Sequence, residues 1–286
     1  MTTAGAREGH SRLLFAFTID VDWFPGSHTG LLRLFEFCER QALATSLFVT
    51  GRFAETYPDL IREGARRGYE IGTHGWEHGL DPVEDFRSGS REEQYRWLTL
   101  STEAVDKASG VTPVAFRAPN LSLGETTLGL LESLNYRFDS SVPARRFDLG
   151  YGQVSSPRYF WAPLRPYHPA PDNLAAEGSS PILEIPPSAF VLPMNMSALR
   201  VLGLPALAWA ARRIARRSPI LVFYAHPVEF ELAENQQLPA GQPRRYQQGL
   251  GAHNLVILER FVEYVRHLGY ASVTLSAAGN GARGTA

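Results

Sequence analysis

The sequence has only one cysteine, Cys38, so no disulfide bond can form within the chain. Cys38 continues an apolar helical pattern with Leu31, Leu34 and Phe35, a setting in which a free thiol usually packs as a small core residue. An excess of charge of one sign is also missing, because 28 basic and 29 acidic residues give a net charge of -1. The chain therefore has no broad positive field for gathering nucleic acid, and we expect no nucleic-acid partner.

Long hydrophobic runs are absent as well. Residues 1–11 are small and polar and lack the apolar stretch of a signal peptide, so we expect a disordered N-terminus at residues 1–12 and a cytoplasmic protein. The segment 201–211 is uncharged but far shorter than the roughly 18 to 20 residues that a spanning helix needs. We therefore predict no transmembrane segment.

The composition that is present is that of a globular enzyme-sized domain. With 44% hydrophobic and 20% charged residues, the chain can bury a substantial core. Its 286 residues exceed an average domain, but single α/β barrels reach this length, so we expect one large domain at residues 13–275. Residues 276–286 are mostly small, which predicts a flexible tail.

Strand-like and helix-like segments alternate along most of the chain. The predicted strands are residues 13–22, 45–49, 69–73, 114–117, 136–139, 220–225 and 271–275. The predicted helices are residues 29–41, 57–67, 90–108, 122–134, 197–217 and 255–268. Two of them begin with a capping-box pattern, at Ser90 and Ser122. This order predicts an α/β fold with a parallel sheet, closed or nearly closed, interrupted at about residues 141–187 by an irregular insertion or antiparallel flap.

Two carboxylates end the first predicted strand. Alternation along this strand puts Thr18, Asp20 and Asp22 on one face, opposite the large apolar side chains. The pair lies just before a break at Pro25, at the carboxyl end of the strand, where barrels and open α/β folds place their active sites. An Asp-x-Asp pattern also occurs as a loop cap or a solvated strand end, so by itself it is weak evidence for chemistry.

Two histidines and two further polar residues also follow predicted strands. His74 and His78 are four residues apart, so one helical turn or a compact loop would aim both imidazoles the same way, as in helical zinc motifs. A hydrogen-bonded or exposed pair of histidines is the alternative. Arg117 and His226 also end predicted strands, and a charged residue directly after a buried strand costs desolvation energy unless it is paired or used.

These residue types together fit metal-assisted hydrolysis. Two imidazoles and one carboxylate form a facial set of ligands with positions left open, as catalytic Zn²⁺ or Fe²⁺ sites require. The second carboxylate, the arginine and the third histidine are then available for proton transfer while a metal polarises an acyl oxygen. Fe²⁺-dependent oxygen chemistry with the same ligands and a non-catalytic sugar-binding module are the rival interpretations.

Six short segments, in order along the chain, resemble the polysaccharide deacetylases with a NodB-homology domain, carbohydrate esterase family 4. They are Thr-Ile-Asp-Val-Asp (18–22), Thr-His-Gly-Trp-Glu-His (73–78), Phe-Arg-Ala-Pro-Asn (116–120), Phe-Asp-Ser-Ser-Val (138–142), Glu-Ile-Pro (184–186) and Val-Phe-Tyr-Ala-His-Pro (222–227). The third and sixth look most like the branch associated with exopolysaccharide and exosortase loci. The resemblance implies a deformed seven-stranded (β/α) barrel and a hydrolase of linear amides that acts as a deacetylase.

The resemblance also implies a role for each residue. The metal ligands would be Asp22, His74 and His78. Asp20 would be the catalytic base, oriented by Arg117, and His226 the general acid. The expected metal is Zn²⁺, with Co²⁺, Ni²⁺ or Fe²⁺ as alternatives. The expected substrate is an amino sugar carrying an N-acetyl or other N-acyl group, in a glycan, a nucleotide sugar or a lipid-linked precursor.

Secondary features leave the substrate open. A backbone N–H near Asn120 would help to stabilise the oxyanion, Trp23 would stack on a sugar ring or pack in the core, and Asp139 would be a second-shell partner or a strand-end cap. Asp-Val-Asp replaces the adjacent aspartates of many members, and Asn120 replaces the usual aromatic residue. Deformylases of lipid-linked aminoarabinose share the Asp-x-Asp form, and some relatives hydrolyse cyclic imides or allantoin, a few without metal.

Four arginines end the predicted helix 197–217. They are Arg212, Arg213, Arg216 and Arg217. An apolar helix that ends in basic residues can rest on an anionic membrane surface, here beside a lipid-linked substrate, and peripheral membrane contact is therefore one interpretation. A solvated helix C-terminus is the other.

Overall fold

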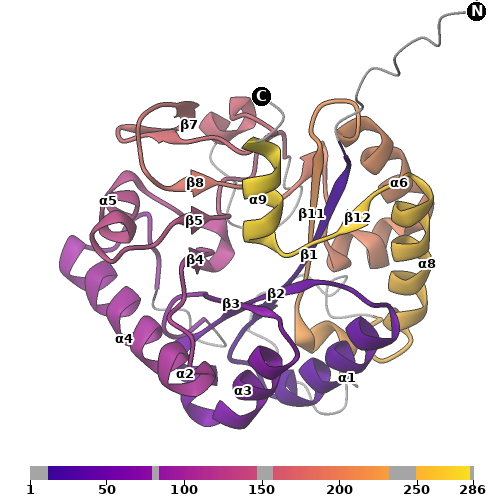
Figure 1. Ribbon diagram of the computed structural model, residues 1–286, viewed down its shortest axis with the longest axis horizontal. Coiled ribbons are helices and arrows are strands. Elements are labelled where there is room, and N and C mark those ends of the chain that lie inside the picture. Colours follow the sequence, from indigo (N-terminus) through magenta and orange to yellow (C-terminus); the bar gives the residue numbers. More distant parts are fainter. Residues whose placement is uncertain (1–11, 79–83, 147–156, 232–248, 284–286) are drawn as a thin grey trace, which may run out of the picture.

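A parallel sheet curls through the centre of the computed structural model, which describes residues 12–78, 84–146, 157–231 and 249–283, and helices surround it (Figure 1). The sheet strands are β1 (Leu14–Val21), β2 (Thr45–Val49), β3 (Glu70–Thr73), β4 (Ala115–Phe116), β5 (Phe138–Asp139), β8 (Leu183–Glu184), β11 (Ile220–Ala225) and β12 (Ala271–Ser272). Their order is β11-β1-β2-β3-β4-β5-β8, with β12 on β1, and all pairs are parallel. The α/β fold and the deformed (β/α)7 barrel are confirmed.

The central strand β1 separates two apolar layers. Its residues on one face belong to a large cluster with the outer helices: Phe15, Phe17, Ile19 and Val21. On the other face, Leu14 and Ala16 belong to a smaller cluster inside the curl of the sheet. Because side chains alternate along a strand, Asp20 also lies on this inner face. The predicted alternation is confirmed, and it brings a carboxylate into the interior of the barrel.

Helices cover the outside of the sheet. They are α1 (Ser27–Arg40), α2 (Gly51–Thr56), α3 (Pro58–Arg66), α4 (Arg91–Ser109), α5 (Glu125–Ser133), α6 (Met196–Ile214) and α8 (Asn254–His267). The predicted capping box at Ser90 is confirmed, since its hydroxyl accepts a hydrogen bond from the Glu93 N–H. The one at Ser122 is wrong: α5 begins after Gly124, and the Ser122 hydroxyl donates to Asp85, a stronger charged acceptor. No described helix is both long and apolar enough to cross a membrane.

The expected insertion at residues 141–187 extends too far. β8 lies inside that range, yet it pairs with β5 through Phe138–Leu183 and Asp139–Glu184 and so belongs to the main sheet. A two-residue strand is too short to show a period in the sequence. The described remainder contains η2 (Pro157–Trp161) and the antiparallel pair β6 (Pro169–Ala170) and β7 (Asn173–Glu177), as a flap would.

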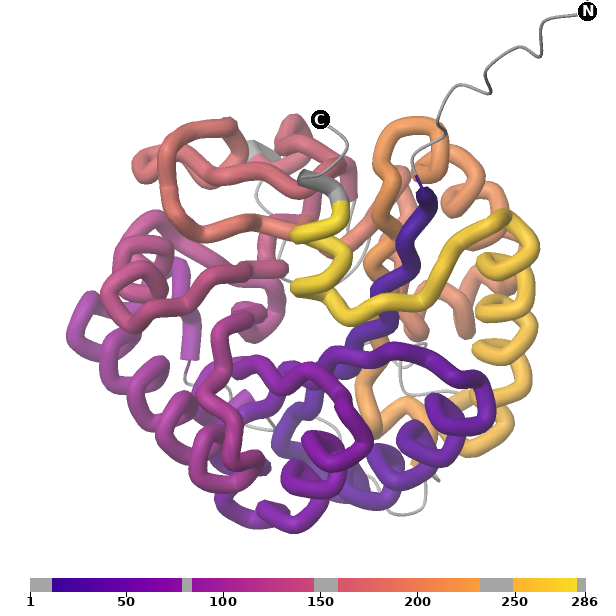
Figure 2. The backbone as a smooth tube through the Cα atoms, viewed as in Figure 1, coloured from indigo at the N-terminus to yellow at the C-terminus, as the bar shows by residue number. Residues whose placement is uncertain are grey.

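Four short elements lie around the barrel in the described part of the chain. A second antiparallel pair, β9 (Ala189–Phe190) and β10 (Leu192–Pro193), follows β8. The 3₁₀ turn η1 (Pro119–Leu121) comes shortly after β4, and the 3₁₀ turn η3 (Pro227–Phe230) comes shortly after β11. In Figure 2 the orange strand β11 runs beside the indigo strand β1, with which it pairs.

Residues after 275 form a helix rather than a free tail over most of their length. Helix α9 spans Leu275–Arg283, and Leu275 and Ala278 are fully buried in the inner cluster. Small residues allow this close packing, because a Cβ on Gly279 would lie 2.6 Å from the Ile185 side chain. Since the inner cluster includes Leu14 and Ile220, the first residues of β1 and β11, α9 closes the amino-terminal end of the barrel. The predicted tail is therefore corrected up to residue 283.

Candidate metal centre and active site

The polar residues predicted to end strands meet at the opposite, carboxyl-terminal end of the barrel. The registers Val21–Val49, Val49–Thr73 and Thr73–Phe116 align the ends of four neighbouring strands. His226 directly follows β11 on the other side of β1. The structure therefore brings together side chains that are up to 206 positions apart in sequence, and it does so with parallel strands alone.

Asp22, His74 and His78 form a set that can hold a metal ion. One ligand atom from each lies within 4.8 Å of the others. The His74 Nε2 atom is 3.4 Å from Asp22 Oδ1, and the two imidazole rings are 5.5 Å apart. Asp22 Oδ1 and His78 Nδ1 are buried, and neither has a hydrogen-bond partner among the residues that the structure describes. Because unsatisfied buried polar atoms are costly, this donor set fits a cation bound between the three side chains.

The protonation of Asp22 and His78 suits a cation, whereas burial is outweighed at His74 by the neighbouring Asp22, which raises the pKa of that imidazole in the absence of a metal. Burial alone would raise the pKa of Asp22, but the three surrounding histidines hold it below its ordinary range. Burial lowers the pKa of His78 to about 4. A carboxylate and a neutral imidazole are the forms in which these side chains bind metals. Among the described residues, Asp22 has only histidines as ionic partners.

Backbone contacts fix the two histidines. The His74 Nδ1 atom hydrogen-bonds the Arg117 carbonyl at 2.7 Å, a contact that is usual for the second ring nitrogen of a metal-binding histidine. This contact directs the Nε2 atom of His74 toward Asp22. The turn between the histidines is held by Glu84, whose carboxylate accepts hydrogen bonds from the N–H groups of Trp76 and Glu77 at 2.9–3.0 Å. We did not predict Glu84 from the sequence.

A glycine makes that contact possible. Gly75 has a φ of +73°, and a Cβ there would lie 2.7 Å from the Glu84 carboxylate. Burial raises the pKa of Glu84 to about 7, although the two backbone N–H groups oppose the shift. Glu84 and Gly75 therefore shape the loop that presents both histidines without facing the metal position themselves.

Asp20 has a different environment from Asp22. Arg117 is fully buried and its Nη1 donates to Asp20 Oδ1 and to the Thr18 hydroxyl, each at 2.7 Å. Its other nitrogens donate to the carbonyl and hydroxyl of Ser140, and its guanidinium lies 4.3 Å from the Phe48 ring centre. These contacts hold the guanidinium in place, and Arg117 contacts Asp20, the residue that the family resemblance implies it orients.

His226 is paired with an acid that the sequence analysis missed. Its Nδ1 atom is 3.3 Å from Glu229 Oε2, and its backbone N–H donates to the same oxygen. Its Nε2 atom lies 4.0 Å from Asp22 Oδ2, and the side chain is 26% exposed. Burial alone would lower the pKa of His226. The hydrogen bond to Glu229 and the charge of Asp22 outweigh burial and raise this pKa to about 9. The Glu three positions after His226 was the signal in the sequence, since that spacing is typical of a cap.

The three secondary residues are placed differently from the ligands. Asp139 is buried and accepts a hydrogen bond from the Ser141 hydroxyl, and it is paired with Glu184, so it contacts no metal ligand directly. Trp23 packs against Tyr57, with the ring centres 6.1 Å apart. This contact agrees with the second interpretation of Trp23, packing within the protein rather than stacking on a sugar. Asn120 is exposed in the turn η1 with a φ of +55°. Nothing in these contacts assigns a substrate role to Asn120 or Trp23.

The first half of the chain is similar to known polysaccharide deacetylases. Residues 12–138, somewhat under half of the chain, match the polysaccharide deacetylase family model. The peptidoglycan deacetylase-like protein FGM2 of Gibberella zeae is 28% identical over 124 residues, 43% of this chain and 35% of that protein. The peptidoglycan deacetylase of Helicobacter pylori is 26% identical over 44% of this chain and 41% of that protein. The chain thus spans well under half the length of these curated relatives.

Solved structures agree over nearly the whole chain. The Xyl-CE4 domain of a multidomain xylanase from the hindgut metagenome of Trinervitermes trinervoides is similar, with a TM-score of 0.55 and 15% identity over 96% of this chain and 92% of that one. At this identity the likeness concerns the fold alone. The chain is thus similar to the polysaccharide deacetylase family over residues 12–138, and its fold is similar to that of a carbohydrate esterase family 4 domain.

Proposed function

We propose that this protein is a metal-dependent hydrolase that removes an N-acetyl group from an amino sugar. One observation carries the proposal: two neighbouring aspartates have different partners. Asp22 lies with two histidines and has a buried oxygen without a hydrogen-bond partner, whereas Asp20 is held by Arg117. One carboxylate is thereby available for a metal and the other for a proton.

The side chains divide the reaction as follows. Asp22, His74 and His78 would hold the metal, which supplies Lewis-acid polarisation of the acyl oxygen and of water. Asp20 accepts a proton from the attacking water, whose oxygen forms a bond with the acyl carbon. His226 donates a proton to the nitrogen as the carbon–nitrogen bond breaks, which yields a carboxylic acid and a free amine. Thus every proton that moves has a donor or an acceptor.

The sugar is inferred from the relatives and the motifs. The names of two curated relatives refer to peptidoglycan, a polymer that contains N-acetylated amino sugars. We therefore infer an N-acetylated glycan or a lipid-linked or nucleotide-activated sugar as the substrate class. The exopolysaccharide-associated branch belongs to this proposal on the sequence motifs alone, and the Asp-x-Asp form keeps a formyl group as an alternative acyl group.

Acyl release from a substrate panel tests the proposal. The zinc-loaded protein is incubated without oxygen with N-acetylated oligosaccharides, an N-formyl amino sugar and a cyclic imide. Acetate, formate and the ring-opened half-amide of the imide are measured. We expect acetate from an amino sugar, loss of release with His226→Ala, and little change with His267→Ala, a control histidine on α8. Absence of release from every compound, or turnover only with oxygen, would contradict the proposed reaction.

A further inference from the structure

The stretch between Glu184 and Glu229 contains no acidic residue, although it includes five arginines. It forms β9, β10, α6 and β11. Helix α6 buries one apolar face but also exposes large apolar side chains: Val201, Leu202 and Trp209 are 43–47% exposed. Its last turn and the residues after it supply the exposed arginines. An outer helix normally turns charged residues outward, so this face is unusual for one that contacts only water.

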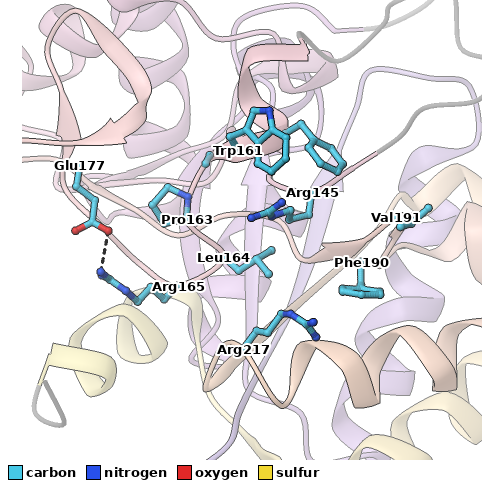
Figure 3. A pocket seen from close by; sticks show the side chains of 11 residues that line it. Arg145, Trp161, Pro163, Leu164, Arg165, Glu177, Phe190, Val191 and Arg217 are labelled. Atoms are coloured by element: carbon cyan, nitrogen blue, oxygen red, sulfur yellow. Dashed lines mark hydrogen bonds and ion pairs between the residues drawn. The ribbon is translucent and has the colours of Figure 1, made fainter.

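A neighbouring pocket continues the same kind of surface. It has a volume of about 590 Å³ and is lined by residues of η2, the β9–β10 turn and the chain after α6, among them Arg145, Trp161, Phe190, Val191 and Arg217 (Figure 3). Trp161 is 72% exposed and Val191 is 42% exposed.

The pocket and the helix are in direct contact. The Phe190 ring packs edge-on against Trp209 of α6, with ring centres 5.3 Å apart. We call the combined region the Trp161–Trp209 surface, and it consists of Arg145, Trp161, Phe190, Val191, Trp209, Arg213 and Arg217.

Each arginine of this surface lies against an aromatic ring. The guanidinium carbons of Arg145 and Arg217 lie 4.8 Å from the ring centres of Trp161 and Phe190, and that of Arg213 lies 5.7 Å from Trp209. Throughout the described part of the chain, none of these three arginines forms a salt bridge. The one carboxylate in the pocket wall, Glu177, is bonded to Arg165 at 2.7 Å.

We propose that the Trp161–Trp209 surface docks the protein on an anionic phospholipid bilayer. Tryptophans are favoured at the membrane interface because their rings are apolar and their N–H groups are polar, while arginines bind lipid phosphates and stay near aromatic rings. The Trp161–Trp209 surface presents tryptophans and arginines together, and the one carboxylate in its described pocket wall, Glu177, is paired with Arg165. The exposed apolar side chains on the outer face of α6 favour a bilayer over a soluble acidic sugar, which would need only the pocket. The proposal does not depend on the hydrolase activity.

Sedimentation with lipid vesicles tests the docking surface. The full-length protein is mixed with vesicles of phosphatidylglycerol and phosphatidylcholine, or of phosphatidylcholine alone, at low and high salt. We expect binding to the anionic vesicles only, weakened by salt. Replacing both Arg213 and Arg217 with glutamine should reduce the apparent affinity at least about tenfold, since each basic residue near an anionic surface contributes about 1 kcal/mol. The double variant Trp161→Ser, Trp209→Ser should also bind more weakly.

A second exposed aromatic and basic site provides the control. Tyr95, 48% exposed, lies on α4 with the exposed Arg91 and Arg96. The triple variant Tyr95→Ser, Arg91→Gln, Arg96→Gln should bind vesicles like the unmodified protein. The proposal is overturned by equal binding to both vesicle types, by no binding, or by arginine variants that bind normally. It is also overturned if the surface instead binds a soluble acidic oligosaccharide or joins two copies of the chain.

Discussion

Asp20 and Asp22 are two positions apart on one strand, point to the same side and have different partners. Arg117 donates a hydrogen bond to Asp20, while Asp22 faces histidines and keeps one buried oxygen without a hydrogen bond. A buried carboxylate that lacks a fixed donor is a good metal ligand, whereas an arginine fixes the orientation of a carboxylate, as a positioned general base requires. The chemistry we propose depends on this difference.

Substituting Asp20 with asparagine should separate catalysis from metal binding. The amide keeps the size of the side chain but cannot accept the proton of water, so we expect turnover to fall by about 10²- to 10⁴-fold. Metal content should stay unchanged, because Asp20 is not among the three clustered ligands. Steady-state kinetics and metal analysis on the same preparation check both points. Undiminished turnover would show that Asp20 is not the base.

Sequence reasoning at this scale found the residues that end strands but missed the residues that hold them. The predicted convergence of Asp22, His74 and His78 is confirmed, while the catalytic roles remain predictions. Glu84 and Glu229 were missed because each acts through backbone N–H groups of a nearby loop. Such contacts depend on the path of a loop, for which the sequence has no periodic pattern.

Among the elements, β5 and β8 are joined by a buried pair of acids. Burial and the neighbouring Asp139 raise the pKa of Glu184 well above its ordinary range, so the pair holds a proton in the folded state. A raised folded pKa stabilises the fold at low pH, and this contribution is lost as the pH rises from the ordinary glutamate range through the raised value. The junction between these strands should therefore weaken as the pH increases.

Glu184→Gln tests this pH dependence. Glutamine can still hydrogen-bond Asp139 and the Val142 N–H but does not titrate. As the pH rises above the ordinary range of a glutamate, the free energy of unfolding of the unmodified protein should fall more steeply than that of the variant. Urea unfolding at a series of pH values measures both slopes. Equal slopes would mean that Glu184 gives up its proton without affecting stability.

Helix α9 closes the end of the barrel away from the active site. Leu275 is fully buried there, so Leu275→Ala should lower the free energy of unfolding by about 2–4 kcal/mol. Asn280→Ala, an exposed change in the same helix, should alter it by less than about 0.5 kcal/mol. Chemical denaturation compares the two. Similar small effects would indicate that the segment behaves as the free tail expected from its composition.

Sequence patterns predict the long buried elements of this fold and miss the short ones. The long strands β1, β2 and β11 were predicted because five to eight buried residues reveal both their length and their faces. β8 has two residues and was assigned to an insertion, and α9 is rich in glycine and alanine and was assigned to a tail. Both are stabilised by long-range packing, which overrides local propensity.

For the whole molecule, the candidate site depends on the assembly of the sheet. Its residues come from the ends of β1, β4 and β11 and the loop after β3, so they converge only when these strands are in register. A ligand that binds only the folded arrangement stabilises the fold. Metal binding should therefore report on the central claim more directly than turnover, which also requires the correct sugar.

The decisive measurement is the metal content of the purified protein and three variants. We predict about one divalent ion per chain for the unmodified protein and for Asp20→Asn, and loss of the ion in Asp22→Asn and His78→Ala. Circular dichroism confirms that each variant is folded. Retention of a full equivalent of metal by folded Asp22→Asn and His78→Ala would contradict the account, because the ion would then be bound elsewhere.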